Sequence, residues 1–259
     1  MDSDLEFALR LADTADAITL ARFRAVDLRV TRKPDRTPVT DADTAVEDAL
    51  RRLIDDERPG DAVLGEERGG AVPEAGRGWV LDPIDGTKNF SRGMPAWASL
   101  IALTEHGQPV VGVASAPALG RRWWAARGAG AWTYDAPGAT PRQIAVSGVC
   151  ELSDAYLSTT DIQTFAELGR REDYLRLVDA CWETRAFGDF WQHCLVAEGV
   201  LDIAVDPAAN SWDLAALQPI LAEAGGTLTD LAGDPTYTGG DGLSSNGAVH
   251  GAALGIVGR

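Results

Sequence analysis

The chain has 259 residues, of which 45% are hydrophobic and 24% are charged, and its formal net charge is −16 at pH 7. A chain of this length can bury a core as one large domain or as two small ones. The acidic balance argues against nucleic-acid binding, because a polyanion would be repelled. No apolar run approaches the roughly 18 residues of a membrane span. The sequence therefore argues against a nucleic-acid or membrane partner.

Cysteine usage and the N-terminus both indicate a cytoplasmic protein. Cys150, Cys181 and Cys194 are odd in number and form no C-x-x-C pair, which is typical of reduced thiols, and we expect them to be small core residues. The first residues are acidic, whereas a signal peptide begins with a basic region. The scattered histidines argue against a zinc site.

The first half of the chain predicts two helices followed by short strands. Apolar residues at helical spacing indicate a helix over residues 3–25 and another that starts near Asp41 and ends at Pro59-Gly60. Short apolar runs indicate strands, and the turn at residues 106–109 predicts a hairpin. The expected strands are residues 62–65, 79–81, 99–103, 110–114, 122–126 and 143–146.

The second half of the chain has more helical spacing. The Pro-Gly stretch at residues 137–141 marks an expected boundary between two subdomains, about 1–140 and 141–259, of a single domain. The mixture predicts an α+β fold of layered helices and sheets, with much antiparallel pairing in the first half. The expected helices are residues 190–198 and 214–224, and the expected strands are residues 201–205 and 227–231.

Carboxylates follow apolar runs at several places. In the stretch VLDPIDGT, Asp82 and Asp85 come just past an expected strand. A carboxylate at the end of a buried strand is costly unless it is paired, and few Lys or Arg residues stand beside these positions. A hard divalent cation such as Mg²⁺ would pair them, because it prefers oxygen ligands. The other acids placed in this way are Asp41 and Asp43 in PVTDAD, Glu66 and Glu67 in VLGEE, and Asp213 in SWDLAA.

Gly86 and Thr87 follow these aspartates directly and add an anion site. A glycine turn that opens a helix exposes backbone N–H groups, which bind anions. Thr87 could also orient or deprotonate a water molecule. These residues together predict a phosphate held by amides on one side and by metals on the other.

Each of the other acids, taken alone, has a simpler interpretation. Asp41 and Asp213 suit helix N-caps. Asp43 suits the first turn of a helix, and Glu66 suits an ordinary charged loop. The DPIDGT stretch fits an ordinary turn less well, because two acids leave a strand together and are followed by Gly and Thr.

The motifs VTDAD, GEE, DPIDGTKNF and WDLAA…EAGG resemble, in this order, those of the inositol monophosphatase family of Mg²⁺-dependent, lithium-sensitive phosphatases. The resemblance covers nearly the whole chain, and DPIDGT together with WDxAA is strongly specific. It implies a layered α-β-α-β-α sandwich that assembles as a homodimer. It also implies two or three Mg²⁺ ions per site and hydrolysis of a phosphate monoester by a metal-activated water.

The same resemblance assigns roles to residues of this chain. It implies catalytic roles for Asp43, Glu66 and Thr87, of which Asp43 helps Thr87 to activate the water. It implies that the amides of Gly86 and Thr87 hold the phosphate. The metal ligands that it implies are Glu66, Asp82, Asp85 and Asp213, with the backbone carbonyl of Ile84.

The choice of phosphate ester depends on the second half of the chain. In the family, a glycine-containing turn and an acid shortly before WD contact the organic part of the substrate, which makes Gly188, Asp189 and Asp206 candidates here. Asp189 stands where inositol phosphatases commonly have a small or hydroxyl residue, and GDF, DGTKNF and RRWWAARGAGA resemble the histidinol-phosphatase branch. An acid at this place would favour histidinol, which carries an ammonium group, over uncharged inositol.

Alternatives remain open around this substrate site. Asp189 would also suit the cap of the helix that follows it, and Arg185 could pair with it and cancel its charge. Asn89 could bind the imidazole of the substrate or satisfy its own turn. Lys33 could neutralise acid near the metals, and Lys88 could approach the phosphate.

The sequence therefore predicts a Mg²⁺-dependent phosphomonoesterase that converts histidinol phosphate to histidinol and phosphate in histidine biosynthesis. The first enzyme alternative is a broad-specificity inositol-1-phosphate phosphatase. A nucleotide-bisphosphate or fructose-bisphosphate phosphatase is a weaker option. The non-enzyme alternative is a metal-binding regulator, against which the complete acidic set and Thr87 argue.

Overall fold

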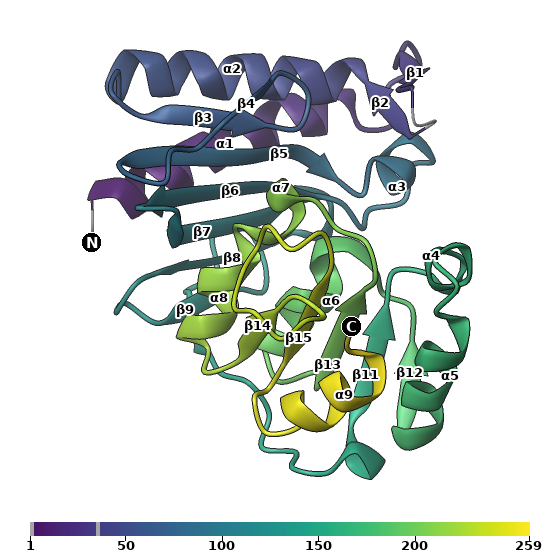
Figure 1. Cartoon of the computed structure of the whole chain (residues 1–259). Coiled ribbons are helices and arrows are strands. Elements are labelled where there is room, and N and C mark those ends of the chain that lie inside the picture. Colours follow the sequence, from purple (N-terminus) through teal and green to yellow (C-terminus); the bar gives the residue numbers. More distant parts are fainter. Residues whose placement is uncertain (1–2, 35–36) are drawn as a thin grey trace.

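The chain folds into five layers, in the order helices, sheet, helices, sheet, helices (Figure 1). The computed structural model describes residues 3–34 and 37–259. The expected α-β-α-β-α sandwich is therefore confirmed. The first layer is α1 (Ser3–Arg22) and α2 (Asp41–Glu57), the middle layer is α6 (Asp189–Ala197), α7 (Ser211–Leu214) and α8 (Leu217–Glu223), and the last layer is α4 (Ile162–Glu167), α5 (Arg171–Ala180) and α9 (His250–Val257).

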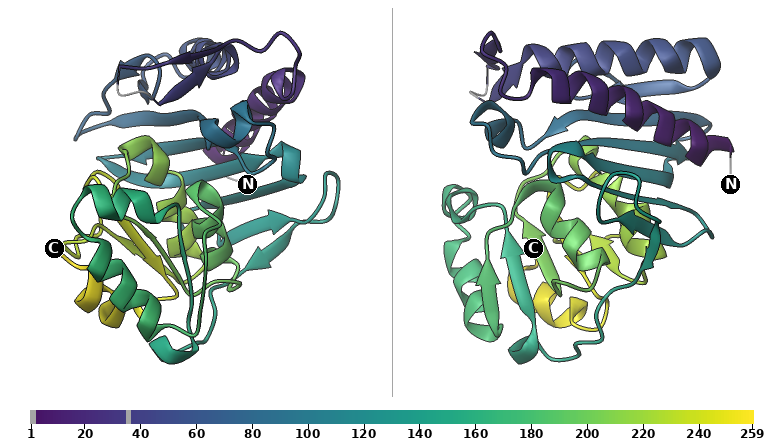
Figure 2. Two further views of the ribbon diagram at one scale, coloured as in Figure 1. Left: turned by 90° about the vertical axis from the view of Figure 1, so that its right-hand side faces the viewer. Right: turned by 180° about the vertical axis from the view of Figure 1, so that it is seen from behind.

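In both views of Figure 2, α1 and α2 lie at the opposite end of the molecule from α4, α5 and α9. Within the described ranges 3–34 and 37–259, no helix is both long and apolar enough to cross a membrane. The shorter elements are the paired strands β1 (Val30–Arg32) and β2 (Pro38–Thr40), helix α3 (Thr87–Ser91), and the 3-10 turns at Pro117–Leu119 and Leu152–Asp154.

The first sheet has eight strands in the order β10-β9-β8-β7-β6-β5-β3-β4. Only the β3–β5 pair is parallel among the neighbours of this sheet. Alternate residues of its strands pack against α1 and α2 on one face and against the middle helices on the other, which explains their continuous apolar runs. The strands are β3 (Ala62–Gly65), β4 (Gly69–Gly70), β5 (Arg77–Asp85), β6 (Ala98–Glu105), β7 (Gln108–Ala116), β8 (Arg121–Ala126), β9 (Ala131–Tyr134) and β10 (Arg142–Ile144).

The second sheet has five strands in the order β12-β11-β13-β15-β14. The pairs β12–β11 and β11–β13 are parallel, whereas β13–β15 and β15–β14 are antiparallel. The carboxyl ends of β11 and β13 therefore meet at one edge of the sheet, where the candidate site lies. The strands are β11 (Tyr156–Thr159), β12 (Glu183–Arg185), β13 (Ile203–Asp206), β14 (Thr227–Thr229) and β15 (Gly242–Ser245).

Several predicted boundaries differ from the structure. The first helix ends at Arg22, three residues earlier than expected. The expected helix over residues 214–224 is divided into α7 and α8, and Pro219 at the start of α8 has no backbone N–H for a continuous hydrogen-bond ladder. The first sheet extends to Ile144, slightly past the expected boundary. Cys194 is buried as expected, but Cys150 is exposed, so the expectation of core thiols is wrong for Cys150.

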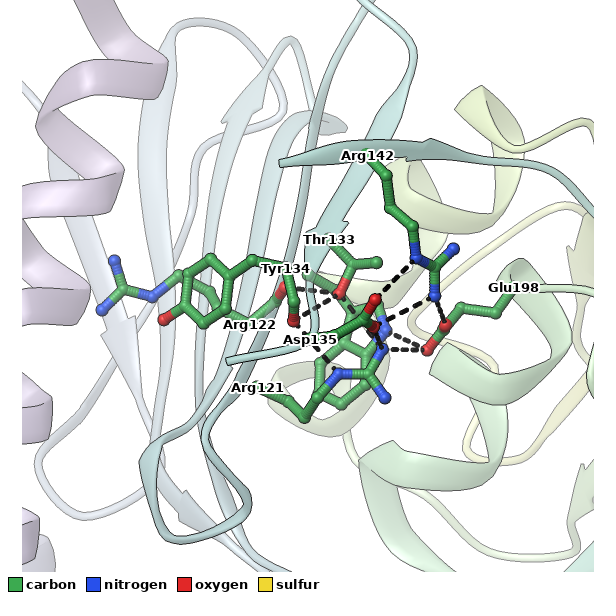
Figure 3. Close-up of polar contacts among 8 residues, drawn as sticks. Arg121, Arg122, Thr133, Tyr134, Asp135, Arg142 and Glu198 are labelled. Carbon is green, nitrogen blue, oxygen red and sulfur yellow. Dashed lines mark hydrogen bonds and ion pairs between the residues drawn. The ribbon is translucent and has the colours of Figure 1, made fainter. Parts of the chain in front are cut away.

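Helix α6 is held at its C-terminal end by a cluster of charged and aromatic side chains (Figure 3). Glu198 follows the last helical residue, and its side chain is only 3% exposed. Its carboxylate accepts hydrogen bonds from Arg121 at 2.8 Å, from the indole of Trp123 at 2.7 Å, and from Arg142. This contact ties α6 to β8 and β10 of the first sheet. The opposite end of the same helix enters the candidate site.

Candidate active site

A pocket of about 630 Å³ lies where the ends of β5 and β13 meet the first turns of α6 and α7. Asp85 comes from the first sheet, whereas Asp189, Asp206 and Asp213 come from the second half of the chain. Its volume falls in the range of small-molecule sites. Six acids line this pocket, since Glu66 and Asp161 join these four, and this determines its chemistry.

Asp82, Asp85 and Asp213 form a cluster that suits a metal ion. Each offers one carboxylate oxygen, and these oxygens lie within 4.8 Å of one another. Burial, followed by repulsion from neighbouring acids, raises the pKa of Asp82 and of Asp85 well above their ordinary value, and burial raises the pKa of Asp213 to about 7. Ionised together, these groups are costly unless a cation joins them, and an all-oxygen set fits a hard divalent cation.

A bulge in β5 brings Asp82 and Asp85 to the same side. Residues three apart in a regular strand point to opposite faces of the sheet. The pairing with β6 shifts register between Asp82 and Asp85. Pro83, which has no N–H to donate, occupies this irregular position, as prolines within sheets commonly do. The sequence DPID is thus the local cause of the acid pair.

Asp85 is also tied to α6, because its Oδ2 accepts the backbone N–H of Phe190 at 2.6 Å. Asp82 is ordered by its own turn and accepts the N–H of Ile84 at 2.9 Å. The acid pair therefore has fixed orientations before any cation binds. Preorganised ligands of this kind reduce the ordering needed for metal binding.

Glu66 lies beside Asp82, since it contributes to the raised pKa of that residue. Lys33 Nζ lies 2.6 Å from Glu66 Oε1 and 2.6 Å from Glu67 Oε1. The expectation that Lys33 neutralises acid near the metal cluster is therefore confirmed. Glu66 is within reach of the cluster but is bound to this lysine in the structure.

Thr87 and Asp43 meet beside the acid cluster. Thr87 Oγ1 lies 2.9 Å from the carbonyl oxygen of Ile84 and 3.3 Å from Asp43 Oδ1. Asp43 Oδ2 accepts both the hydroxyl and the N–H of Thr40, at 2.5 and 2.8 Å. Burial, opposed by the bonds from Thr40, raises the pKa of Asp43 to about 6. Thr40 is the N-cap of α2, so the interpretation of Asp41 as the cap is wrong.

Gly86 has a φ of 81°, in the left-handed region, and it precedes α3. A Cβ at this position would lie 3.0 Å from the carbonyl oxygen of Ala96 and 3.3 Å from Asp189 Oδ2. Glycine is therefore required both by the backbone conformation and by the space. The turn brings Asp189 close to the first half of the site.

Asp189 lies in the pocket with its carboxylate held by Asn89. Asn89 Nδ2 donates to Asp189 Oδ2 at 3.1 Å and to the carbonyl oxygen of Ala96 at 2.8 Å. Burial, reinforced by repulsion from Asp206 and opposed by Lys88, raises the pKa of Asp189 to about 6. Lys88 also lines the pocket.

Two alternatives for Asp189 are contradicted. The N-cap of α6 is Gly188, and Asp189 is the first helical residue. The N–H groups at this helix end are accepted by Thr160 and Asp85, not by Asp189. Arg185 pairs with Glu183 at 2.6 Å rather than with Asp189. The carboxylate of Asp189 is therefore neither a helix cap nor cancelled by that arginine.

Asp206 is more deeply engaged with the protein than expected. Its carboxylate accepts hydrogen bonds from Thr160 at 2.7 Å, from Gln192 at 2.9 Å, and from His193 at 2.8 Å. None of these three donors was expected from the sequence. His193 follows Asp189 by four residues, the spacing that places two helical side chains on one face, so this signal was present.

Comparison with known proteins agrees with the motifs. The family model described as "Inositol monophosphatase family" matches residues 1–257. A "Histidinol-phosphatase" of Mycobacterium tuberculosis is 55% identical, with 97% of this chain and 96% of the relative covered. One of Streptomyces coelicolor is 48% identical, with 98% and 96% covered. The solved structure of an inositol monophosphatase from Zymomonas mobilis superposes with a TM-score of 0.85 at 33% identity, with 99% and 98% covered. The chain therefore belongs to the inositol monophosphatase family.

Proposed function

We propose that this protein is a Mg²⁺-dependent phosphomonoesterase that hydrolyses histidinol phosphate to histidinol and phosphate, a step in histidine biosynthesis. The names of its relatives support the reaction. The single observation that carries the choice of substrate is a carboxylate, Asp189, held in the pocket 3.1 Å from Asn89 and close to the Gly86 turn. A partly buried carboxylate favours a cationic leaving group over a neutral one.

In this proposal two or three Mg²⁺ ions bind between the two halves of the site. Their ligands are the side chains of Glu66, Asp82, Asp85 and Asp213 and the carbonyl oxygen of Ile84. When bound, Mg²⁺ offsets the repulsion among the acids, stabilises charge on the phosphoryl group and lowers the pKa of the attacking water. Glu66 would hold the cation with an oxygen that now pairs with Lys33, so Lys33 would act as its counter-ion in the metal-free protein.

Asp43 and Thr87 handle the proton of the attacking water. The Thr87 hydroxyl lies within reach of Asp43 Oδ1, so a proton that it receives has an acceptor beside it. A raised pKa, about 6 for Asp43, suits a group that accepts a proton near neutral pH. Glu66, which contributes to the raised pKa of both Asp43 and Asp82, would assist beside them. The amides of Gly86 and Thr87 hold the phosphate, with Lys88 nearby.

The organic part of the substrate lies against Gly188, Asp189 and Asp206. Asn89 donates to both Asp189 and the carbonyl of Ala96, so its amide nitrogen orients the acid, and its contact with an imidazole would use Oδ1. Asp189 pairs with the ammonium group. Asp206 accepts hydrogen bonds from α6 and from Thr160, so it supports this side of the pocket.

The test is phosphate release from histidinol phosphate and inositol-1-phosphate, measured side by side with Mg²⁺ and after treatment with EDTA. We expect a higher kcat/KM for histidinol phosphate, loss of turnover with EDTA and recovery on addition of Mg²⁺. A preference for inositol-1-phosphate would favour the alternative substrate. Turnover that survives EDTA would contradict the metal mechanism, and silence on both esters would favour a regulator.

A further inference from the structure

Thr160 connects Asp189 and Asp206, the two acids that we propose to lie against the organic part of the substrate. It comes directly after β11, and Asp206 is the last residue of β13, which runs parallel to β11. The register pairs Thr159 with Val205, so the next residue of each strand, Thr160 and Asp206, lies at the same edge. Thr160 Oγ1 lies 2.7 Å from Asp206 Oδ1 and 3.0 Å from the backbone nitrogen of Asp189.

The direction of these two bonds is fixed by chemistry. A backbone N–H can only donate, so Thr160 Oγ1 accepts at Asp189. The single hydroxyl proton of Thr160 is then available for the carboxylate of Asp206. Gln192 and His193 also donate to that carboxylate, which holds it in place. The result is one directed chain, from the Asp189 N–H through Thr160 to Asp206.

The backbone at Asp189 needs this support. Asp189 has a φ of 48°, in the left-handed region that side chains other than glycine rarely adopt. It is also the first residue of α6, whose N-cap, Gly188, has no side chain to accept an N–H. Thr160, from a different element, supplies the missing acceptor. Asp85 accepts the next N–H, that of Phe190, and Asn89 holds the carboxylate, so Thr160 completes the support at the Asp189 N–H itself. Loss of its hydroxyl would weaken the hold on the direction of the Asp189 carboxylate.

We propose that Thr160 is a positioning residue for substrate choice, which aims the carboxylate of Asp189 at a cationic leaving group by fixing its backbone against Asp206. This inference rests on the proposed function, because it concerns how that substrate is preferred. Thr160 holds neither the phosphate nor the metal ligands. Its loss acts on the leaving-group side of the pocket.

The test compares the wild type with Thr160→Val, which keeps the shape and removes the hydroxyl, and with Thr160→Ser, which keeps the hydroxyl. KM and kcat are measured for histidinol phosphate and for inositol-1-phosphate at saturating Mg²⁺. We expect Thr160→Val to raise KM for histidinol phosphate by about tenfold, which is the fold-change that corresponds to the loss of one hydrogen bond. The KM for inositol-1-phosphate should rise less. Thr160→Ser keeps the hydroxyl, so its KM for histidinol phosphate should be close to that of the wild type.

Two further variants separate positioning from a general loss of stability. Thr159→Val removes the neighbouring hydroxyl, which donates to the carbonyl of Val205 at 2.8 Å and does not reach Asp189. It should leave the ratio of the two KM values unchanged. In the Asp189→Ala background, Thr160→Val should have no further effect on KM for histidinol phosphate, because the group that it positions is gone.

Equal KM changes on both esters, or a full effect of Thr160→Val in the Asp189→Ala background, would overturn the inference. If Thr160→Val does not fold, Thr160→Ala replaces it, with the same expectations. Failure of the proposed function has a different signature, since the wild type would then release no phosphate from histidinol phosphate. Normal wild-type turnover with unselective Thr160 variants would overturn the role of Thr160 alone.

Discussion

Asp85 is the residue at which the two halves of the site meet. Its carboxylate is part of the acid cluster and also accepts the N–H of Phe190 at 2.6 Å. Asn at this position would keep an oxygen for that N–H but would lose the charge. In the metal-free protein, where burial and then Asp189 raise the pKa of Asp85, the loss of charge removes repulsion rather than a stabilising bond.

We therefore expect Asp85→Asn to reduce turnover by at least about a hundredfold, a loss of metal binding and of transition-state stabilisation, while the metal-free protein unfolds at an equal or higher temperature. Phosphate release and thermal unfolding, each with and without Mg²⁺, measure both effects. The stabilisation by Mg²⁺ seen in the wild type should be much smaller in the variant. Full activity of Asp85→Asn would remove Asp85 from the metal site.

Asp189 allows a second test at the residue scale. Its carboxylate is free of Arg185 and is oriented by Asn89. Asp189→Ala should raise KM for histidinol phosphate by about ten- to a hundredfold, the range for a lost charged hydrogen bond, and change KM for inositol-1-phosphate much less. Asp189→Asn is the matched control for charge, and it should resemble the alanine variant. Equal changes on both esters would contradict recognition by charge.

At the scale of elements, the sequence predicted the long strands of the first sheet and missed several elements of the second half, including α5 (Arg171–Ala180). The long strands β5, β6 and β7 have continuous apolar runs because both of their faces are covered. Strand β12 (Glu183–Arg185) is polar because it lies at a sheet edge, and β15 (Gly242–Ser245) is short and rich in small residues. Neither has a hydrophobic pattern, since their pairing depends on neighbours far along the chain.

The residues of the candidate site also divide into those that the sequence predicted and those that it did not. Asp82, Asp85 and Asp213 were predictable, because each stands where an apolar run ends or a helix begins. Thr160 was not, because its role depends on the register of β11 beside β13 and its partner Asp206 lies 46 residues away. The bulge that places the first two aspartates on one side also depends on pairing with β6.

Helix α6 carries Asp189 at one end and is held by Glu198 at the other, and this arrangement gives a prediction at the element scale. Glu198 and Asp135 both pair with Arg121 and Arg142 (Figure 3), but their side chains are 3% and 62% exposed. Glu198→Gln should lower the free energy of unfolding by about 2–3 kcal/mol, because it leaves buried donors poorly paired. Asp135→Asn should cost less than about 0.5 kcal/mol.

Denaturant unfolding of the two variants measures the difference. Glu198→Gln keeps a side-chain oxygen for the indole of Trp123, so the loss reports mainly on charge. The ratio of KM values for the two phosphate esters should stay unchanged, since Thr160 and Asn89 fix Asp189 locally. Similar destabilisation by both variants would show that burial does not decide the strength of this cluster.

At the scale of the whole molecule, the acidic site lies between two sheets, which pack against the middle helices in one shared core. Asp82 and Asp85 belong to the first sheet, whereas Asp213 belongs to the second half of the chain. A cation bound among them therefore joins the two halves. Any ligand that binds only the folded state stabilises it, so Mg²⁺ should act on the stability of the entire protein and not only on its activity.

The pH dependence of this stabilisation follows from the raised pKa values. In the metal-free protein the pKa of Asp213 is about 7 and those of Asp43 and Asp189 are about 6, each raised first by burial from 3.8. Between about pH 4 and pH 7 the folded state holds more protons than the unfolded chain, so the free energy of unfolding falls as the pH rises. Bound Mg²⁺ offsets the charge that develops, so its stabilising effect grows with pH.

We expect EDTA-treated protein to unfold at a lower temperature at about pH 8 than at about pH 6, and Mg²⁺ to raise the unfolding temperature more at the higher pH. Differential scanning calorimetry at both pH values tests this, and a metal-free protein that is equally stable at both would mean that the pKa values of these carboxylates are not raised in the fold.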